Sequence, residues 1–73
     1  MMYYEPDIDE FRKVAEEGDA DHQYYLGQYY QKGEFVPKDH QEAVKWYRKA
    51  AEQGHNIAQK SLGWMYQIGK GVK

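Results

Sequence analysis

The chain repeats itself after 36 residues. When the sequence is aligned with itself at this offset, Arg12-Lys13 falls on Arg48-Lys49, and Leu26-Gly27 falls on Leu62-Gly63. An internal repeat of this period is typical of helical solenoids, in which each unit is a pair of packed helices. Twelve of the 26 aligned pairs from Arg12/Arg48 to Pro37/Lys73 are identical. Besides the four identical pairs just named, they are Ala15-Glu16 with Ala51-Glu52, Gly18 with Gly54, Gln23 with Gln59, Tyr30-Gln31 with Tyr66-Gln67, Gly33 with Gly69, and Val36 with Val72.

Helix-starting and helix-ending residues divide the sequence into four segments. Pro6 suits the first turn of a helix, and the acidic residues that follow it complement the helix dipole. Asp19 is a preferred N-cap residue, and Asp39 begins a D-x-x-E capping box that is completed by Glu42. No segment alternates with period two for long enough to predict a strand. The predicted helices cover residues 6–17, 20–32, 40 to about 53, and 56–68, each followed by a glycine: Gly18, Gly33, Gly54 and Gly69.

Apolar and small residues at intervals of three and four predict the buried face of each helix. A glycine inside a helix costs about 1 kcal/mol relative to alanine. Gly27 and Gly63 stand at equivalent mid-helix positions, so both predict close approach of a neighbouring helix. The predicted buried sets are Ile8, Phe11, Val14 and Ala15; His22, Leu26, Gly27 and Tyr30; Ala43, Trp46, Tyr47, Ala50 and Ala51; and Ala58, Leu62, Gly63, Met65 and Tyr66.

Length and charge limit the classes of protein that this sequence can encode. Seventy-three residues predict one small domain, and the absence of cysteine excludes disulfides and thiolate metal sites. Ten basic and 12 acidic residues balance to a net charge of −2, which gives no electrostatic basis for a nucleic-acid or anionic-membrane partner. No run approaches the length of a membrane span, and residues 1–7 do not resemble a signal peptide. We make no prediction of the localisation.

Characteristic residues recur in the helix predicted at residues 40 to about 53, such as Trp46-Tyr47, and in the second copy, such as Leu62-Gly63 and Met65-Tyr66. With these residues the chain resembles the Sel-one-like repeat family, a relative of the tetratricopeptide repeats. The resemblance covers about residues 11–73. Two positions depart from the family pattern, because His22 replaces a small alanine and Phe35 replaces the second loop glycine. The matching residues are Asp39, Ala43, Trp46-Tyr47, Lys49-Ala50-Ala51, Gln53-Gly54, Ala58, Leu62-Gly63, Met65-Tyr66, Gly69 and Gly71-Val72.

This resemblance implies an all-α fold, an α/α solenoid of antiparallel helix pairs in a right-handed superhelix with about two repeats. Within one domain, 1–73, it implies an N-terminal helix at 6–17, a first full repeat at 19–54 and a partial second repeat at 55–73. The resemblance also implies an adaptor that binds other proteins and performs no chemistry. We therefore expect a protein or peptide partner, no enzyme activity and no cofactor.

The residues give the same expectation for catalytic and metal sites, of which we predict none. The three histidines, His22, His40 and His55, are not spaced at i, i+3 or i+4 from one another, and no acidic cluster completes a metal or catalytic site around them. A hydrolase would need converging polar groups, which the sequence does not present. Asp7, Asp9 and Glu10 are explained by the first turn of a helix.

Candidate binding residues follow from the expected stacking, in which the first helix of each repeat lines a concave surface. Tryptophan and tyrosine dominate the energetics of protein interfaces. The alternative for Trp64 is packing against a following repeat or a second copy. The predicted partner-binding residues are Asp21, Tyr24, Tyr25, Gln28, Gln31, Lys60, Ser61, Trp64, Gln67 and Ile68, with Ile57 beside them.

An alternative function is self-association. Solenoid repeats bury their faces on neighbouring repeats, and fewer than three are seldom stable alone. The helix predicted at 56–68 lacks the second helix of its pair. We therefore expect either a longer natural protein or a homo-oligomer, formed by domain swapping or head-to-tail packing through this helix.

Overall fold

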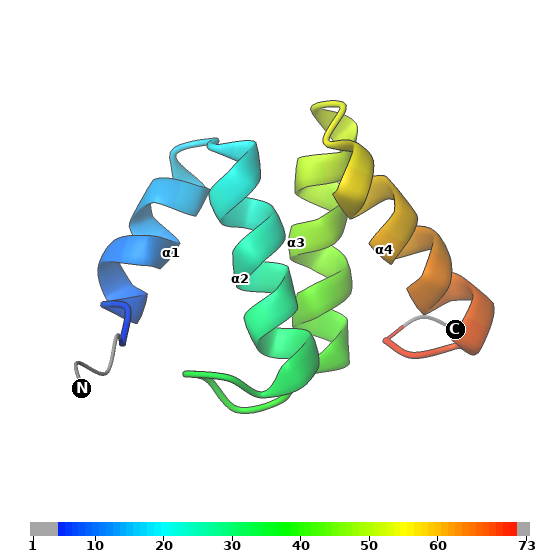
Figure 1. Ribbon diagram of the computed structural model, residues 1–73, viewed down its shortest axis with the longest axis horizontal. Helices are drawn as coiled ribbons and strands as arrows, with labels where there is room; N and C mark the ends of the chain where they lie inside the picture. The colour runs from blue at the N-terminus through cyan, green and yellow to red at the C-terminus, as the bar shows by residue number, and fades with distance from the viewer. Residues whose placement is uncertain (1–4, 72–73) are drawn as a thin grey trace.

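Four antiparallel helices make up the part of the chain that the structure, a computed structural model, describes, residues 5–71. They are α1 (Ile8–Glu16), α2 (Ala20–Lys32), α3 (His40–Glu52) and α4 (Asn56–Ile68), and the described residues contain no strand. The helices stand side by side in chain order, as Figure 1 shows, and span 38 × 23 × 19 Å. The predicted all-α solenoid is confirmed.

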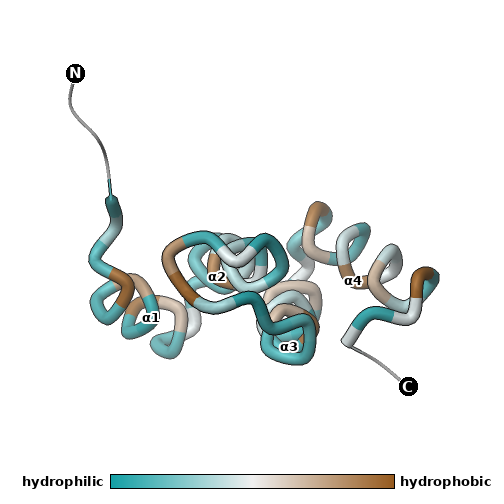
Figure 2. The backbone as a smooth tube through the Cα atoms, turned by 90° about the horizontal axis from the view of Figure 1, so that it is seen from below, coloured by the Kyte–Doolittle hydropathy of each residue, from teal (hydrophilic) through white to brown (hydrophobic). Residues whose placement is uncertain are grey.

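The helices form two layers. Seen from below, α1 and α3 lie in one layer, and α2 and α4 lie in the other (Figure 2). Contacts join each helix to the next one along the chain, α1 to α2, α2 to α3, and α3 to α4. The first helices of the two repeats, α2 and α4, therefore share one face of the molecule.

Local capping explains where each helix begins. The carboxylate of Asp19 accepts the N–H of His22, as predicted. The prediction that Pro6 occupies the first turn of α1 is wrong. The Asp7 carboxylate accepts the N–H groups of Asp9 and Glu10 from an extended backbone, so Asp7 is the N-cap and the helix begins at Ile8.

Only half of the predicted capping box forms at α3. Asp39 accepts the N–H of Glu42 at 3.1 Å, but its own N–H donates to the Tyr30 carbonyl at 2.9 Å. The Glu42 carboxylate pairs instead with the Lys45 ammonium group, 3.4 Å away. The backbone bond from Asp39 to Tyr30 ties the loop after α2 back onto that helix.

The core consists of two clusters that share Tyr30. Ala15, Leu26 and Trp46 form one cluster between α1, α2 and α3. The other lies between α3 and α4, with α2 side chains packed against it, and is made of Ala43, Val44, Tyr47 and Met65. A predicted core position, Leu26, is fully buried, whereas Leu62 is partly buried at the edge of the second cluster.

Two predicted core residues of α4 are exposed, Gly63 and Tyr66, and Tyr66 is 48% exposed. His22 is partly buried beside Phe11. Partial burial is also found for the predicted core residues Ile8, Phe11, Val14, Tyr30, Ala51 and Leu62. Gln23, a polar residue, is buried. Its side-chain amide donates a hydrogen bond to the Ala15 carbonyl, which an apolar residue at this position could not do. Val44 is a core residue that the spacing of α3 did not predict.

Identical residues of the two copies make identical contacts. The Gln23 amide donates to the carbonyl of Ala15 at 3.0 Å, and Gln59 donates in the same way to Ala51 at 3.2 Å. Each bond crosses the turn between two helices and satisfies a carbonyl of the preceding helix end. Arg12/Arg48 and Tyr30/Tyr66 are also identical in the two copies because they make the same hydrogen bond. In each copy the arginine guanidinium donates to the hydroxyl of the tyrosine 18 residues later.

The two mid-helix glycines are not equivalent in their surroundings. A Cβ on Gly27 would lie 2.8 Å from the Tyr47 ring and 3.2 Å from the Ala43 carbonyl oxygen, so the predicted close approach is confirmed there. At Gly63 that prediction is wrong within residues 5–71, because a Cβ would meet no heavy atom within 4 Å. The side of α2 that carries Gly27 packs against α3. The equivalent side of α4, which carries Gly63, has no helix packed against it among residues 5–71.

Tyr47 is held in place around Gly27. Its hydroxyl donates to the Gln31 side-chain oxygen at 2.5 Å, and its ring lies 5.8 Å from that of Tyr24. Burial raises the pKa of the Tyr47 hydroxyl well above its ordinary value of 10.0. The folded state therefore holds the neutral phenol.

We predict opposite effects for the same substitution in the two copies. Gly27→Ala should lower the free energy of unfolding by about 1–3 kcal/mol, because Tyr47 must move. Gly63→Ala should raise it by about 0.5–1 kcal/mol, because alanine is the better helix former in open space. Urea unfolding followed by circular dichroism measures both values. Equal effects of the two substitutions would contradict the account.

A second prediction concerns alkaline pH. Tyr47→Phe should cost about 1 kcal/mol at neutral pH through the lost hydrogen bond to Gln31. The raised pKa of Tyr47 means that its contribution is complete below pH 10 and is lost as the pH rises above that value. The unfolding free energy of the parent should then fall faster than that of the variant. A constant difference between the two proteins from about pH 8 to pH 11.5 would show that Tyr47 is not buried as described.

Candidate functional site

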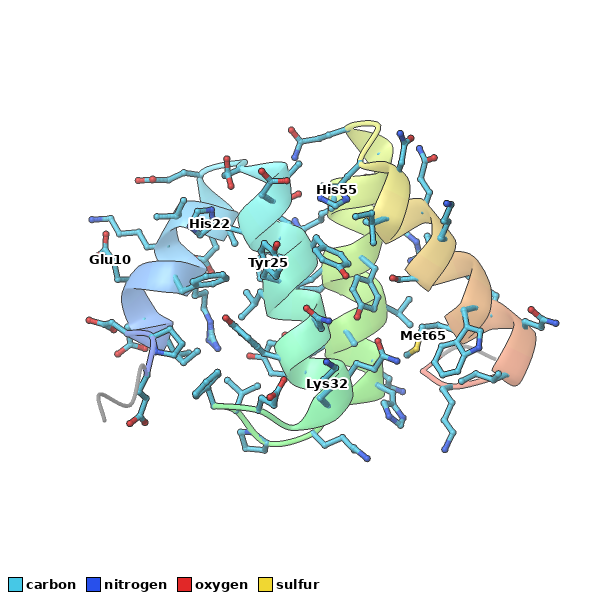
Figure 3. The ribbon with its side chains drawn as sticks, in the orientation of Figure 1. Glu10, His22, Tyr25, Lys32, His55 and Met65 are labelled. Atoms are coloured by element: carbon cyan, nitrogen blue, oxygen red, sulfur yellow. The ribbon has the colours of Figure 1, made fainter. Side chains whose placement is uncertain are left out.

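The side chains that point away from all neighbouring helices form a face on α2 and α4. On α2, Leu26 faces α1 and Gly27 faces α3, which leaves a third side to solvent. Tyr25 lies on this side, facing the viewer in Figure 3, with His55 near the upper end and Lys32 at the lower end. We define the α2/α4 face by the residues at equivalent positions of the two copies, namely Asp21, Tyr25, Gln28 and Lys32 on α2 and Ile57, Ser61, Trp64 and Ile68 on α4.

The two halves of this face differ in chemistry. On α2 its residues are polar or charged apart from the ring of Tyr25, which is 47% exposed. On α4 the equivalents of Asp21, Gln28 and Lys32 are large and apolar. The exposed fractions are 56% for Ile57, 50% for Trp64 and 41% for Ile68. The residues of this α4 row, Ile57, Ser61, Trp64 and Ile68, are separated by four, three and four positions.

Four of the predicted binding residues lie at the edges of the face. Tyr24 stacks on the His55 ring with centroids 4.9 Å apart, and Gln31 accepts the Tyr47 hydroxyl, so both lie beside α3. Lys60 and Gln67 stand at the equivalent positions of α4, on the side where Gly63 is open. The other six, Asp21, Tyr25, Gln28, Ser61, Trp64 and Ile68, belong to the α2/α4 face.

A histidine joins the beginnings of α2 and α4. The His55 Nδ1 atom accepts the N–H of Ala58 at 3.1 Å and so caps α4. The Nε2 atom of the same ring therefore carries the proton and donates to the Asp21 carboxylate at 3.0 Å. No sequence pattern predicts this pair, because 34 residues separate its members and histidine is not a usual N-cap.

A second histidine also has an aspartate partner. His22 lies 2.5 Å from the Asp19 carboxylate, and this hydrogen bond lowers the pKa of Asp19. His22 and His55 thus each contact one carboxylate. Among residues 5–71 no three histidine or acidic side chains gather in a way that could hold a metal ion.

One further feature, a hollow, lies outside the α2/α4 face. A shallow hollow is lined by the start of α3, by Lys45, Arg48 and Tyr66, and by Gly71. Gly71 has a φ of +74°, and a Cβ there would lie 2.3 Å from the His40 carbonyl oxygen, so only glycine fits.

In the part of the chain that the structure describes, no helix combines the length and the apolar character needed to cross a membrane.

Phe35 occupies the position equivalent to Gly71. It adopts a φ of +63°, which is unfavourable for a side chain of this size. Its ring packs edge-on against Tyr29, with centroids 5.1 Å apart. The first loop therefore keeps the backbone shape of the family pattern with an aromatic residue in place of glycine.

Comparison with known proteins identifies the family of these repeats. The Sel1 repeat family model matches residues 20–55 and 56–73. The chain is similar to a solved structure of c5321, a protective antigen of uropathogenic Escherichia coli strains with an SLR fold, at 50% identity and a TM-score of 0.87 over 90% of this chain. It is also similar to a Sel1 repeat protein from Oxalobacter formigenes, at 46% identity and a TM-score of 0.83 over 86% of this chain.

The matched segment is a small part of both solved proteins. It corresponds to 14% of the c5321 chain and 26% of the Oxalobacter formigenes chain. No curated protein matches the sequence. The helix pairs, the repeat period and the matched residues agree, and the chain belongs to the Sel1 repeat family.

Proposed function

We propose that this chain binds a protein or peptide partner through the α2/α4 face. Sel1 repeats generally mediate protein–protein interaction and are typically scaffolds without catalysis. The observation that carries the proposal is the α4 row. Three large apolar side chains stand half-exposed at positions where the first copy has aspartate, glutamine and lysine.

The contrast between the copies separates function from folding. Several positions that support the fold are identical in both copies, such as Gln23/Gln59 and Arg12/Arg48. The α4 row makes none of these contacts, and a soluble helix gains nothing from exposed isoleucine and tryptophan. Burying such side chains against a partner is favourable by about 1.5–3 kcal/mol each when burial is complete. Trp64 is also of the residue type that is most enriched at interface hot spots.

A hydrolase is the less well supported function. Each of His22 and His55 has a single aspartate partner, and His55 already uses both ring nitrogens in capping α4 and binding Asp21. These contacts are explained by helix capping and by the joining of repeats. We therefore propose a non-catalytic role.

Self-association through the uncovered side of α4 is a second candidate. Gly63 is open there, as Gly27 would be without Tyr47. Charge also favours contact between opposite ends of two copies. Residues 1–21 hold eight acidic and two basic residues, whereas residues 22–73 hold four acidic and eight basic ones. The acidic α1 of one copy can thus pack against α4 of the next in a head-to-tail contact.

Site-specific cross-linking tests the proposed function. A photoreactive benzoylphenylalanine at Gln28 should cross-link a different protein in cells of the source organism, and Trp64→Gln should abolish that adduct. The same probe at Glu52, an exposed position of α3, is the control. Adducts that are equal at both positions, or that persist in the Trp64→Gln variant, would contradict binding through this face.

Light scattering separates the second candidate from the first. Head-to-tail packing predicts a mass that increases with protein concentration and decreases in about 1 M salt, which screens the charges. Gly63→Trp should block this association, whereas Trp64→Gln should leave it unchanged. A monomer of 8.7 kDa at all concentrations would refute self-association.

A further inference from the structure

We infer that His55 makes the start of α4 sensitive to pH. Protonation of its ring removes the N-cap of α4 and releases the first turn of that helix, while α1, α2 and α3 keep their caps. The contacts of the two ring nitrogens and the difference between two equivalent caps carry the inference, which does not depend on the proposed function.

The cap of α4 requires a neutral ring. The backbone N–H of Ala58 can only donate, so the Nδ1 atom of His55, 3.1 Å away, must present a lone pair. A proton on Nδ1 replaces this lone pair with a second donor. It also places a positive charge at the N-terminus of α4, where the helix dipole is already positive. The imidazolium therefore cannot cap α4 in this position.

The first copy uses a different residue as the cap. Asp19 and His55 stand 36 residues apart, at equivalent positions of the repeat. Asp19 caps α2, and the carboxylates of Asp7 and Asp39 cap α1 and α3. Aspartate remains ionised from about pH 8 to about pH 5, the range in which histidine gains its proton. Acidification in this range thus acts on α4, which has no acidic residue in its first turn to replace the histidine.

The groups around His55 keep the change local. From α2, the Asp21 carboxylate accepts the Nε2 proton at 3.0 Å, and the Tyr24 ring stacks on the imidazole. In the part of the chain that the structure describes, α3 and α4 interact with His55 through backbone groups only, the Ala50 carbonyl and the N–H groups of Ala58 and Gln59. The negative charge of Asp21 attracts the protonated ring, so a ring that turns out of the cap keeps a partner on α2. Acidification therefore exchanges the cap for an ion pair and leaves the chain folded.

The released turn contains Ile57, the first residue of the α4 row, which is 56% exposed. Further along the helix Met65 is fully buried in the cluster with α3, so the Trp64 end of the row stays in place. Low pH thus alters one end of the α2/α4 face. Weaker binding of a partner at low pH is the one consequence that rests on the proposed function.

Nuclear magnetic resonance of the purified chain between about pH 8 and about pH 5 tests the inference. At the upper pH the ¹⁵N spectrum of the imidazole should show a neutral ring with its proton on Nε2. As the ring takes up a second proton, amide exchange at Ala58, corrected for the intrinsic effect of pH, should accelerate about fivefold, the factor that a typical N-cap supplies. Carbon shifts of residues 56–59 should move towards random-coil values, while those of residues 20–23 stay helical.

Two variants provide the controls. His55→Asn keeps a preferred N-cap that does not titrate, so pH should not affect residues 56–59 in this variant. His22→Gln removes a histidine whose ring contacts Asp19 and caps no helix, and the change at α4 should persist in it.

Several results would overturn the inference. They are a proton on Nδ1 at the upper pH, a ring that stays neutral at the lower pH, and protonation without any change at residues 56–59. The same change in the His55→Asn variant, or its loss in the His22→Gln variant, would assign the pH dependence to another group and overturn the inference as well.

Discussion

The approach of α3 to α2 at Gly27 determines how the remaining helices are arranged. The Tyr47 ring lies where a side chain at Gly27 would be, and its hydroxyl is fixed by Gln31. Tyr47 belongs to one cluster with Ala43 and Val44 of α3 and Met65 of α4. A displaced Tyr47 would therefore move α4 relative to α2, and with it the two halves of the α2/α4 face.

Several repeated residues support the fold, whereas outward positions of α2 and α4 differ between the copies. The glutamine and arginine contacts recur in both copies because each copy must close the same helix turn and support the same tyrosine. On the outward positions nothing in the fold requires similarity. There the first copy presents Asp21, Gln28 and Lys32, and the second presents Ile57, Trp64 and Ile68. This difference is the physical basis of the proposed binding role.

Helix positions were predictable because they depend on local chemistry. Asp19 caps α2 by bonding an N–H three residues away, and glycines follow each helix. The error at Gly63 has another cause, since identical residues predict identical packing only where both have a neighbour. The pairing of Asp21 with His55 depends on how the repeats stack, which no short-range pattern contains. Six of the ten predicted binding residues belong to the α2/α4 face, whereas its member Lys32 was not predicted. The neighbours of Tyr24 and Gln31 depend on the packing of α3, which repeat spacing does not contain.

Nuclear magnetic resonance of the two glycines tests the central claim most directly. The account predicts strong nuclear Overhauser effects between the Gly27 Hα protons and the Tyr47 ring, with Gly27 shifts displaced by the ring current. Gly63 should show no contact with an aromatic ring of another helix within residues 5–71. Gly27 protons without any effect to Tyr47 would contradict the helix spacing on which the α2/α4 face depends.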